Sequence, residues 1–224
     1  MTPATPPSYW AQACAELSAT DPVLGALIAA RASSHPVSRG DPFQTLARSI
    51  VGQQISVKAA QAVWERFEKA ARQVSPARVA RMRLSTLSSA GLSTRKAEYL
   101  KDLAQRFDRG DVDPARWPGL DDEAIIAELV EVRGIGRWTA EMFLIFNLLR
   151  PDVFPVDDLG VLRAMQQQYP DFWPSPPSGA PSARALPDRA VRQAAAALGE
   201  RWRPWRTVAT WYLWRSLEAV PVEY

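Results

Sequence analysis

Apolar residues recur at the helical period along nearly the whole chain, and no segment alternates convincingly as a β-strand does. This pattern predicts an all-α protein. Twelve helices are expected, at 9–18, 22–32, 43–51, 56–71, 76–80, 85–90, 94–108, 122–132, 137–149, 159–168, 188–198 and 204–219. Ser56, Asp41 before Pro42 and Asp188 after Pro187 are start signals for three of them. The proline- and serine-rich stretch 170–187 predicts a long surface loop.

A glycine-containing turn, Gly134-Ile135-Gly136, separates the two helices expected within about 124–149. Glycine adopts backbone angles closed to other residues and lets a ligand approach the main chain closely. The N–H groups at the start of the second helix, at Arg137, point outward and favour an anion such as a phosphate. An ordinary helix–helix turn capped by glycine also fits the three residues, so the turn alone leaves both interpretations open.

Length and composition exclude several classes of protein. With 224 residues and 47% apolar content, the chain can bury a sizeable core in one domain or two small ones. The longest apolar run, at 142–149, is too short for a bilayer, and the first residues lack a signal region. We therefore expect a protein that is not secreted and has no membrane partner. The one cysteine, Cys14, excludes a structural cysteine–zinc site and a four-cysteine iron–sulfur cluster, and the one histidine, His35, argues against histidine-centred catalysis.

The basic residues are mostly arginine, which suits bidentate contacts with phosphate. Arginine-rich codon usage explains this bias about as well, so the placement of charge carries more weight. Seven arginines between 184 and 215 face only Asp188 and Glu200, a surplus of five. This surplus predicts a basic C-terminal face that suits a polyanionic partner.

Four separated motifs resemble those of a known family. Segments 132–140 (VRGIGRWTA) and 152–158 (DVFPVDD) resemble the helix-hairpin-helix and aspartate signature of the HhH-GPD superfamily of DNA base-excision glycosylases. Segments 50–57 (IVGQQISV) and 201–206 (RWRPWR) are similar to its 3-methyladenine DNA glycosylase II branch, which removes alkylated purines. The resemblance runs from about residue 41 to 217.

The resemblance implies a compact, two-lobed helical fold without the N-terminal β-rich domain of some longer relatives. One lobe is expected to comprise 1–40 and 150–224, and the other 41–149, with an active-site cleft between them. It also implies a monomer that acts on double-stranded damaged DNA in the cytoplasm, or wherever genomic DNA resides, without an organic cofactor.

Removal of an alkylated purine develops positive charge on the deoxyribose, while the leaving base is already cationic. A fixed anion near C1′ stabilises this sugar and can orient or deprotonate the attacking water. The resemblance assigns this role to Asp158, which opens the helix expected at Leu159 and lies five residues before Arg163. From the pattern alone, Asp157 and Asp158 are equally well interpreted as helix caps. Asp157 is the expected structural partner.

Trp138 narrows the predicted reaction. In relatives that also cut the DNA strand, this position holds a lysine that forms a Schiff base with the sugar. All four lysines of this chain lie elsewhere, in helix faces expected to be exposed, at 58, 69, 96 and 101. The sequence therefore predicts a monofunctional glycosylase without AP lyase activity.

The resemblance places three residues, Trp138, Trp214 and Met142, near the base pocket. A cationic purine gains cation–π attraction to an indole, once it has left the stack. Plain core packing is the competing interpretation for any tryptophan, and Trp202 and Trp205 are expected to be structural. Met142 departs from the tyrosine of a better-known relative, which leaves the shape of the pocket open.

Gln53 and Gln54 lie in a turn from which family members insert a side chain into the gap left by the extruded nucleotide. Gln54 is the better positional match. The alternative interpretation, in which both glutamines only tie the turn to neighbouring backbone, is equally open. The family's hairpin also holds a monovalent cation, Na⁺ or K⁺, on backbone carbonyls that correspond to Val130, Val132 and Ile135.

Two other functions remain open from the sequence. A helix-hairpin-helix chain can bind DNA without catalysis, which would leave Asp158 idle. Alternatively, the substrate is a neutral lesion, such as uracil, a thymine mispair or an oxidised purine. The missing iron–sulfur cysteines and hairpin lysine weigh against this second alternative.

Overall fold

The computed structural model describes residues 5–173 and 189–217, and every regular element within these ranges is a helix. The predicted all-α fold is therefore confirmed. The chain divides into two compact units, which are described separately below. Unit 1 takes in Met1–Val37 and Leu148–Glu223, and unit 2 takes in Ser38–Asn147. Most of the loop expected at 170–187, the start signal Asp188 and Arg184 lie outside the described residues.

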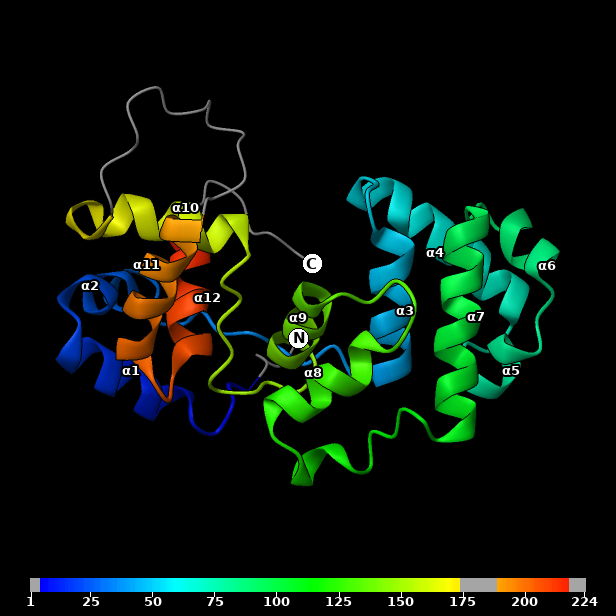
Figure 1. Ribbon diagram of the computed structural model, residues 1–224, viewed down its shortest axis with the longest axis horizontal. Coiled ribbons are helices and arrows are strands. Elements are labelled where there is room, and N and C mark those ends of the chain that lie inside the picture. The colour runs from blue at the N-terminus through cyan, green and yellow to red at the C-terminus, as the bar shows by residue number, and fades with distance from the viewer. Residues whose placement is uncertain (1–4, 174–188, 218–224) are drawn as a thin grey trace. The chain divides into compact units, whose positions relative to one another are not determined.

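Unit 2 is organised around one long helix, α7. The helices of this unit are α3 (Pro42–Gly52), α4 (Val57–Ala71), α5 (Pro76–Ala80), α6 (Leu84–Ser89), α7 (Thr94–Arg109), α8 (Asp122–Val130) and α9 (Arg137–Phe146), with the 3₁₀ turn η1 (Trp117–Gly119) before α8. Figure 1 shows α3 on one side of α7 and α5 and α6 on the other, and all three helices contact α7. Its apolar stripe, with Leu100 and Leu103, is fully buried, and each such leucine contributes about 1.5–3 kcal/mol of burial free energy.

Unit 1 packs around the C-terminal helix. Its elements are α1 (Trp10–Thr20), α2 (Pro22–Ala30), α10 (Leu159–Gln168), α11 (Arg189–Gly199) and α12 (Arg206–Ser216), with the 3₁₀ turns η2 (Pro170–Phe172) and η3 (Glu200–Trp202). Helix α12 contacts α1, α2 and α10 and buries Tyr212 and Leu213 (Figure 1). Trp202 is buried as expected, and its Nε1 donates to Asp21 Oδ2 at 3.0 Å.

The helix boundaries follow the sequence signals closely, and α5 and α10 coincide with the predicted ranges. Helix α9 ends at Phe146 rather than at Leu149, whose positive φ of +53° is incompatible with a continued helix. Just beyond the helix end, the Asn147 side chain donates to Gly40 O and Thr45 Oγ1. The three 3₁₀ turns are not foreseen, since three-residue elements carry no periodicity. None of the described helices is long and apolar enough to cross a membrane.

Candidate functional site

The hairpin in unit 2 joins α8 to α9, and Gly134 is required by its geometry. Gly134 has φ +88°, and a Cβ at this position would collide with the Tyr99 ring of α7. The next contact is also with α7, because Arg133 N donates to Asp102 Oδ2 at 2.9 Å. The turn is therefore held against α7 by backbone contacts that only glycine permits.

Gly136 is the N-cap of α9, and the fold does not require glycine there. Its backbone is extended, with φ −94° and ψ 170°, and an added Cβ would meet nothing within 4 Å. Glycine also supplies no side-chain cap to the first N–H groups of α9. These groups are therefore available to an anion from outside the hairpin.

The Arg137 side chain links the two hairpin helices. Its Nε donates to Glu141 Oε1 on α9 at 2.9 Å, and its Nη1 donates to Glu123 Oε2 on α8 at 2.9 Å. The hydrogen bond that the guanidinium donates to Glu123 raises its pKa above the ordinary value. With this side chain paired to two carboxylates, the predicted phosphate contact of Arg137 is left to its backbone N–H.

Trp138 and Met142 lie one helical turn apart on α9, on the same face. The Trp138 side chain is 39% exposed, which is unusual for an indole on an apolar helix, whereas Met142 is 7% exposed. An exposed indole beside a buried thioether offers a flat surface to an incoming ring. Their place in the base pocket stays a prediction.

The two glutamines between α3 and α4 have different surroundings. The Gln53 Nε2 donates to Gly134 O at 2.8 Å, which ties this turn to the hairpin. Gln54 has φ +59° and is exposed. This left-handed backbone is uncommon for glutamine, and it leaves the side chain accessible to a ligand.

The expectation of four exposed lysines is wrong for two of them. Lys96 is half-buried, and its Nζ donates to Val51 O at 2.8 Å and Gln53 O at 2.6 Å. Lys101 is half-buried too, with Nζ donating to Met82 O at 2.9 Å. Both side chains reach carbonyls at the ends of other helices, where the negative end of the helix dipole attracts a cation. Lys58 and Lys69 are exposed as expected.

In unit 1, Asp158 is the N-cap of α10 and is only 5% exposed. Its Oδ1 accepts two hydrogen bonds at 2.8 Å, one from Val161 N and one from Trp214 Nε1. Hydrogen bonds from two N–H groups stabilise a carboxylate and fix its orientation. Trp214, predicted for the base pocket, is 8% exposed and directs its indole N–H to this carboxylate.

Gly160 makes room for this pair, and sequence reasoning missed it. A Cβ on Gly160 would lie 3.1 Å from Asp158 Oδ1 and 3.2 Å from Trp214 Cδ1. Both distances are tighter than ordinary van der Waals contacts. The available signal was a glycine in the first turn of a predicted helix, where it lowers helix stability without an evident reason.

The basic C-terminal face expected from the arginine surplus stays a prediction, but three of its arginines have carboxylate partners. Arg203 and Arg206 pair with Asp152 at 2.6 and 2.7 Å, and Arg192 pairs with Asp157 at 2.8 Å. These two carboxylates come from outside the counted segment, so they reduce the surplus of five to three. The ion pair with Arg192 also distinguishes Asp157 from Asp158, whose partners are Val161 N and Trp214 Nε1.

The monovalent cation that the family implies at the end of α8, on the carbonyls of Val130, Val132 and Ile135, stays a prediction. Val130 is the last residue of the helix, where carbonyls lack intrahelical donors and the dipole is negative. The Val132 carbonyl accepts from Ile135 N at 3.0 Å and keeps a second lone pair for a cation. No group of three or more acidic, histidine or cysteine side chains in the described ranges would hold a metal ion.

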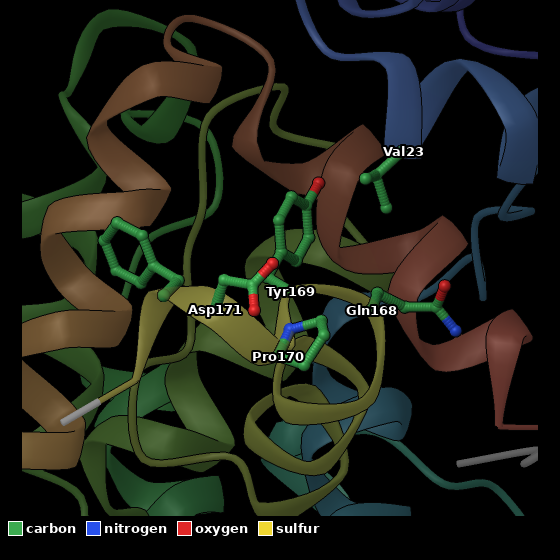
Figure 2. A pocket seen from close by; sticks show the side chains of 6 residues that line it. Val23, Gln168, Tyr169, Pro170 and Asp171 are labelled. Carbon is green, nitrogen blue, oxygen red and sulfur yellow. The ribbon is translucent and has the colours of Figure 1, made fainter. Parts of the chain in front are cut away.

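A shallow pocket of about 280 Å³, shown in Figure 2, lies at the C-terminal end of α10. Asp158 is the N-cap at the other end of this helix. The pocket is lined by residues from α2 and from the end of α10 with the η2 turn, namely Val23, Gln168, Tyr169, Pro170, Asp171 and Phe172. The ten residues of α10 separate it from the carboxylate, which corresponds to about 15 Å of helix rise. None of the predicted site residues lines it.

Comparisons with known proteins identify the family of this chain. The family described as "HhH-GPD superfamily base excision DNA repair protein" matches residues 47–175. The DNA-3-methyladenine glycosylase 1 of Schizosaccharomyces pombe is 30% identical over 185 residues, which is 80% of this chain and 74% of that protein. The chain spans between 57% and 74% of the length of the first three curated relatives that it matches.

Two solved structures share the fold at useful sequence identity. A DNA-3-methyladenine glycosidase from Bacillus halodurans has a TM-score of 0.77 and 31% identity, covering 89% of this chain and 86% of that one. An S. pombe 3-methyladenine DNA glycosylase, solved in complex with abasic DNA, has a TM-score of 0.72 and 29% identity, covering 92% and 96%. The chain therefore belongs to the HhH-GPD superfamily of base excision DNA repair proteins, on the branch whose members are named DNA-3-methyladenine glycosylases.

Proposed function

We propose that this protein is a monofunctional DNA glycosylase that hydrolyses the N-glycosidic bond of alkylated purines in duplex DNA and so initiates base excision repair. The observation that carries the proposal is the buried Asp158 carboxylate, held by Val161 N–H and the Trp214 indole N–H. The names of the relatives mention 3-methyladenine, and the proposal extends to 7-methylguanine because it is also a cationic alkylated purine.

The reaction needs one fixed negative charge. As the C1′–N bond breaks, its electron pair stays with the cationic base, which leaves neutral, and positive charge develops on the sugar. The Asp158 carboxylate stabilises this charge and accepts a hydrogen bond from the attacking water. The water oxygen then bonds to C1′, its proton passes to the carboxylate and on to solvent, and an intact abasic site remains.

Base recognition in this proposal depends on the exposed indole of Trp138. A purine must leave the duplex stack before the carboxylate can act on its sugar, and a flat side chain then holds the extruded base. The positive charge of an alkylated purine adds cation–π attraction that an undamaged base lacks. Met142 completes the same helix face, and the place of Trp214 in the pocket is part of the proposal.

Two turns of unit 2 bind the DNA. The uncapped N–H groups at Gly136 and Arg137 hold a backbone phosphate, with a monovalent cation on the carbonyls at the end of α8. Gln54, rather than Gln53, fills the gap left by the extruded nucleotide, because the Gln53 amide already donates to Gly134 O. The protein acts as a monomer wherever genomic DNA resides.

Strand cleavage is not part of the proposed reaction. Schiff-base chemistry needs a lysine amine at the sugar, and Trp138 occupies the position where lyase relatives carry it. All four lysines lie in α4 and α7, and two of them donate to backbone carbonyls. Borohydride should therefore trap no covalent adduct between the protein and DNA with an abasic site, and an adduct would contradict the monofunctional assignment.

The experiment that tests the proposal is mass spectrometry of the bases released from methylated genomic DNA. The wild type should release methylated purines, and Asp158→Asn should release about a thousandfold less, because one preorganised charge is lost. Asp157→Asn is the matched control, since its carboxylate pairs with Arg192 on the surface, and it should retain wild-type release.

Other outcomes identify the alternatives. DNA binding without release of any base by the wild type would indicate a non-catalytic binding protein. Release of uracil, thymine or oxidised purine in place of methylated purines would move the substrate to neutral lesions. Equal release by the wild type and Asp158→Asn would show that the proposed mechanism is wrong.

A further inference from the structure

Two separate turns of unit 2 rest on the same face of α7. The first is the glutamine turn (53–55) between α3 and α4, and the second is the hairpin turn (133–136) between α8 and α9. The α7 residues that contact them are Lys96, Tyr99 and Asp102, which are spaced three apart and therefore form one stripe. Neither the catalytic step nor base recognition uses this stripe.

Lys96 is hydrogen-bonded to the backbone of the glutamine turn. Its ammonium donates to Val51 O at 2.8 Å and to Gln53 O at 2.6 Å, both at the C-terminal end of α3. Burial lowers the pKa of this ammonium from its ordinary value. A half-buried cation that donates to two carbonyls fixes the backbone from which Gln54 extends with φ +59°.

Gln53 extends this support to the hairpin. Its carbonyl accepts from Lys96, and its side-chain Nε2 donates to Gly134 O at 2.8 Å. The Tyr99 ring lies against Gly134, and Asp102 accepts from the Arg133 N–H. One residue thus joins the turn that carries Gln54 to the turn that presents the Gly136 N–H.

We propose that Lys96 is a positioning residue which, through Gln53, fixes Gln54 at a set distance from the phosphate-binding hairpin. Binding of the backbone phosphate by the hairpin is thereby coupled to insertion of the Gln54 side chain, which keeps the nucleotide extruded. The inference rests on the proposed function, because extrusion has a purpose only if the base is to be released.

The test compares Lys96→Met with Lys101→Met. Both variants replace a half-buried lysine of α7 by an unbranched apolar side chain, but Lys101 donates to Met82 O, away from both turns. The single-turnover release of 7-methylguanine from a duplex should fall about tenfold or more in Lys96→Met and less than about twofold in Lys101→Met. Binding to undamaged duplex should change less than about threefold in either variant, since the N–H groups of α9 remain.

A substrate that needs no wedge separates positioning from general damage to the fold. When the lesion lies opposite an abasic site, it has no partner base, so no base pair has to be broken to extrude it. The release rate of Lys96→Met on this substrate should therefore return to within about threefold of the wild-type rate. Lys96→Arg, which keeps the charge and the donors, should recover most of the rate on the paired duplex. Gln53→Ala, which removes the tie to Gly134, should resemble Lys96→Met, and the double variant should be no slower than either.

Specific results would overturn the inference. Equal rates for Lys96→Met and Lys101→Met on the paired duplex would show that Lys96 positions nothing. If the release rate of Lys96→Met fell equally for lesions opposite a base and opposite an abasic site, the substitution would have damaged the fold instead. Absence of methylpurine release by the wild type would refute the proposed function rather than this coupling, so the two failures are distinguishable.

Discussion

Asp158 in unit 1 and Gly136 in unit 2 both occupy the N-cap of a ten-residue helix, yet the two helix ends differ. At α10 the cap is a carboxylate that accepts from Val161 N and is almost fully buried. At α9 the cap is a glycine with no side-chain hydrogen bond and open space where a Cβ would be. One helix end binds its own anion and orients it, whereas the other is open to an anion from outside.

The difference assigns separate tasks to the two ends. A charge that takes part in chemistry needs a fixed, partly dehydrated environment, which the Trp214 indole and the Val161 N–H provide. A group that binds a phosphate needs only accessible N–H donors on a rigid turn. Variants at the first end should therefore reduce turnover, and variants at the second should reduce affinity.

The largest effect below that of Asp158 itself is expected for Trp214→Phe. This change keeps an aromatic ring but removes the indole N–H that donates to Asp158 Oδ1. We expect the single-turnover rate to fall about a hundredfold, as for the loss of one preorganised donor. Affinity for DNA with an abasic site, measured by fluorescence anisotropy, should stay within about twofold. If the affinity for DNA fell while the single-turnover rate stayed unchanged, Trp214 would contribute to DNA binding rather than to the reaction.

The two hairpin glycines should respond differently to alanine. Gly136→Ala is compatible with the extended backbone but places a methyl group at the uncapped N–H groups. We expect the dissociation constant for duplex DNA to rise about tenfold without a change in stability. Gly134→Ala should lower the free energy of unfolding by more than about 1 kcal/mol, because of its positive φ and the Tyr99 contact. Urea denaturation distinguishes the two variants. Equal destabilisation by both would refute the interpretation that the N-terminus of α9 is open at Gly136.

The smallest effect is expected for Gly160→Ala. The added methyl group would approach Asp158 Oδ1 at 3.1 Å, so the carboxylate and indole must move by a few tenths of an ångström. A displacement of this size should reduce the turnover rate about threefold and leave DNA affinity unchanged. Wild-type turnover would show that the carboxylate tolerates movement.

The sequence predicted the helix boundaries well, but it did not predict hydrogen bonds between residues that are far apart along the chain. The bounds of α5 and α10 were predictable because capping residues and periodicity are encoded within a few residues. The Trp214–Asp158 hydrogen bond joins residues 56 apart, and the Gln53–Gly134 bond joins residues 81 apart. Spacing along the chain does not reveal such contacts.

Contacts between distant segments also explain what the local patterns missed. Lys96 was expected on an exposed helix face, which is wrong because the carbonyls it binds belong to another helix and its turn. The local count of charges did not include Asp152 and Asp157, which lie outside the counted segment and pair with its arginines. Family motifs, in contrast, predicted the fold, and the family model matches residues 47–175.

The central claim is that Asp158 supplies charge for the reaction in addition to capping α10. Asp158→Ser separates these roles, because serine is an equally good N-cap but carries no charge. We predict a melting temperature within about 3 °C of the wild type, together with a single-turnover release of 7-methylguanine that is at least about a thousandfold slower. Wild-type release by a folded Asp158→Ser protein would show that this carboxylate is a structural cap and that the catalytic group lies elsewhere.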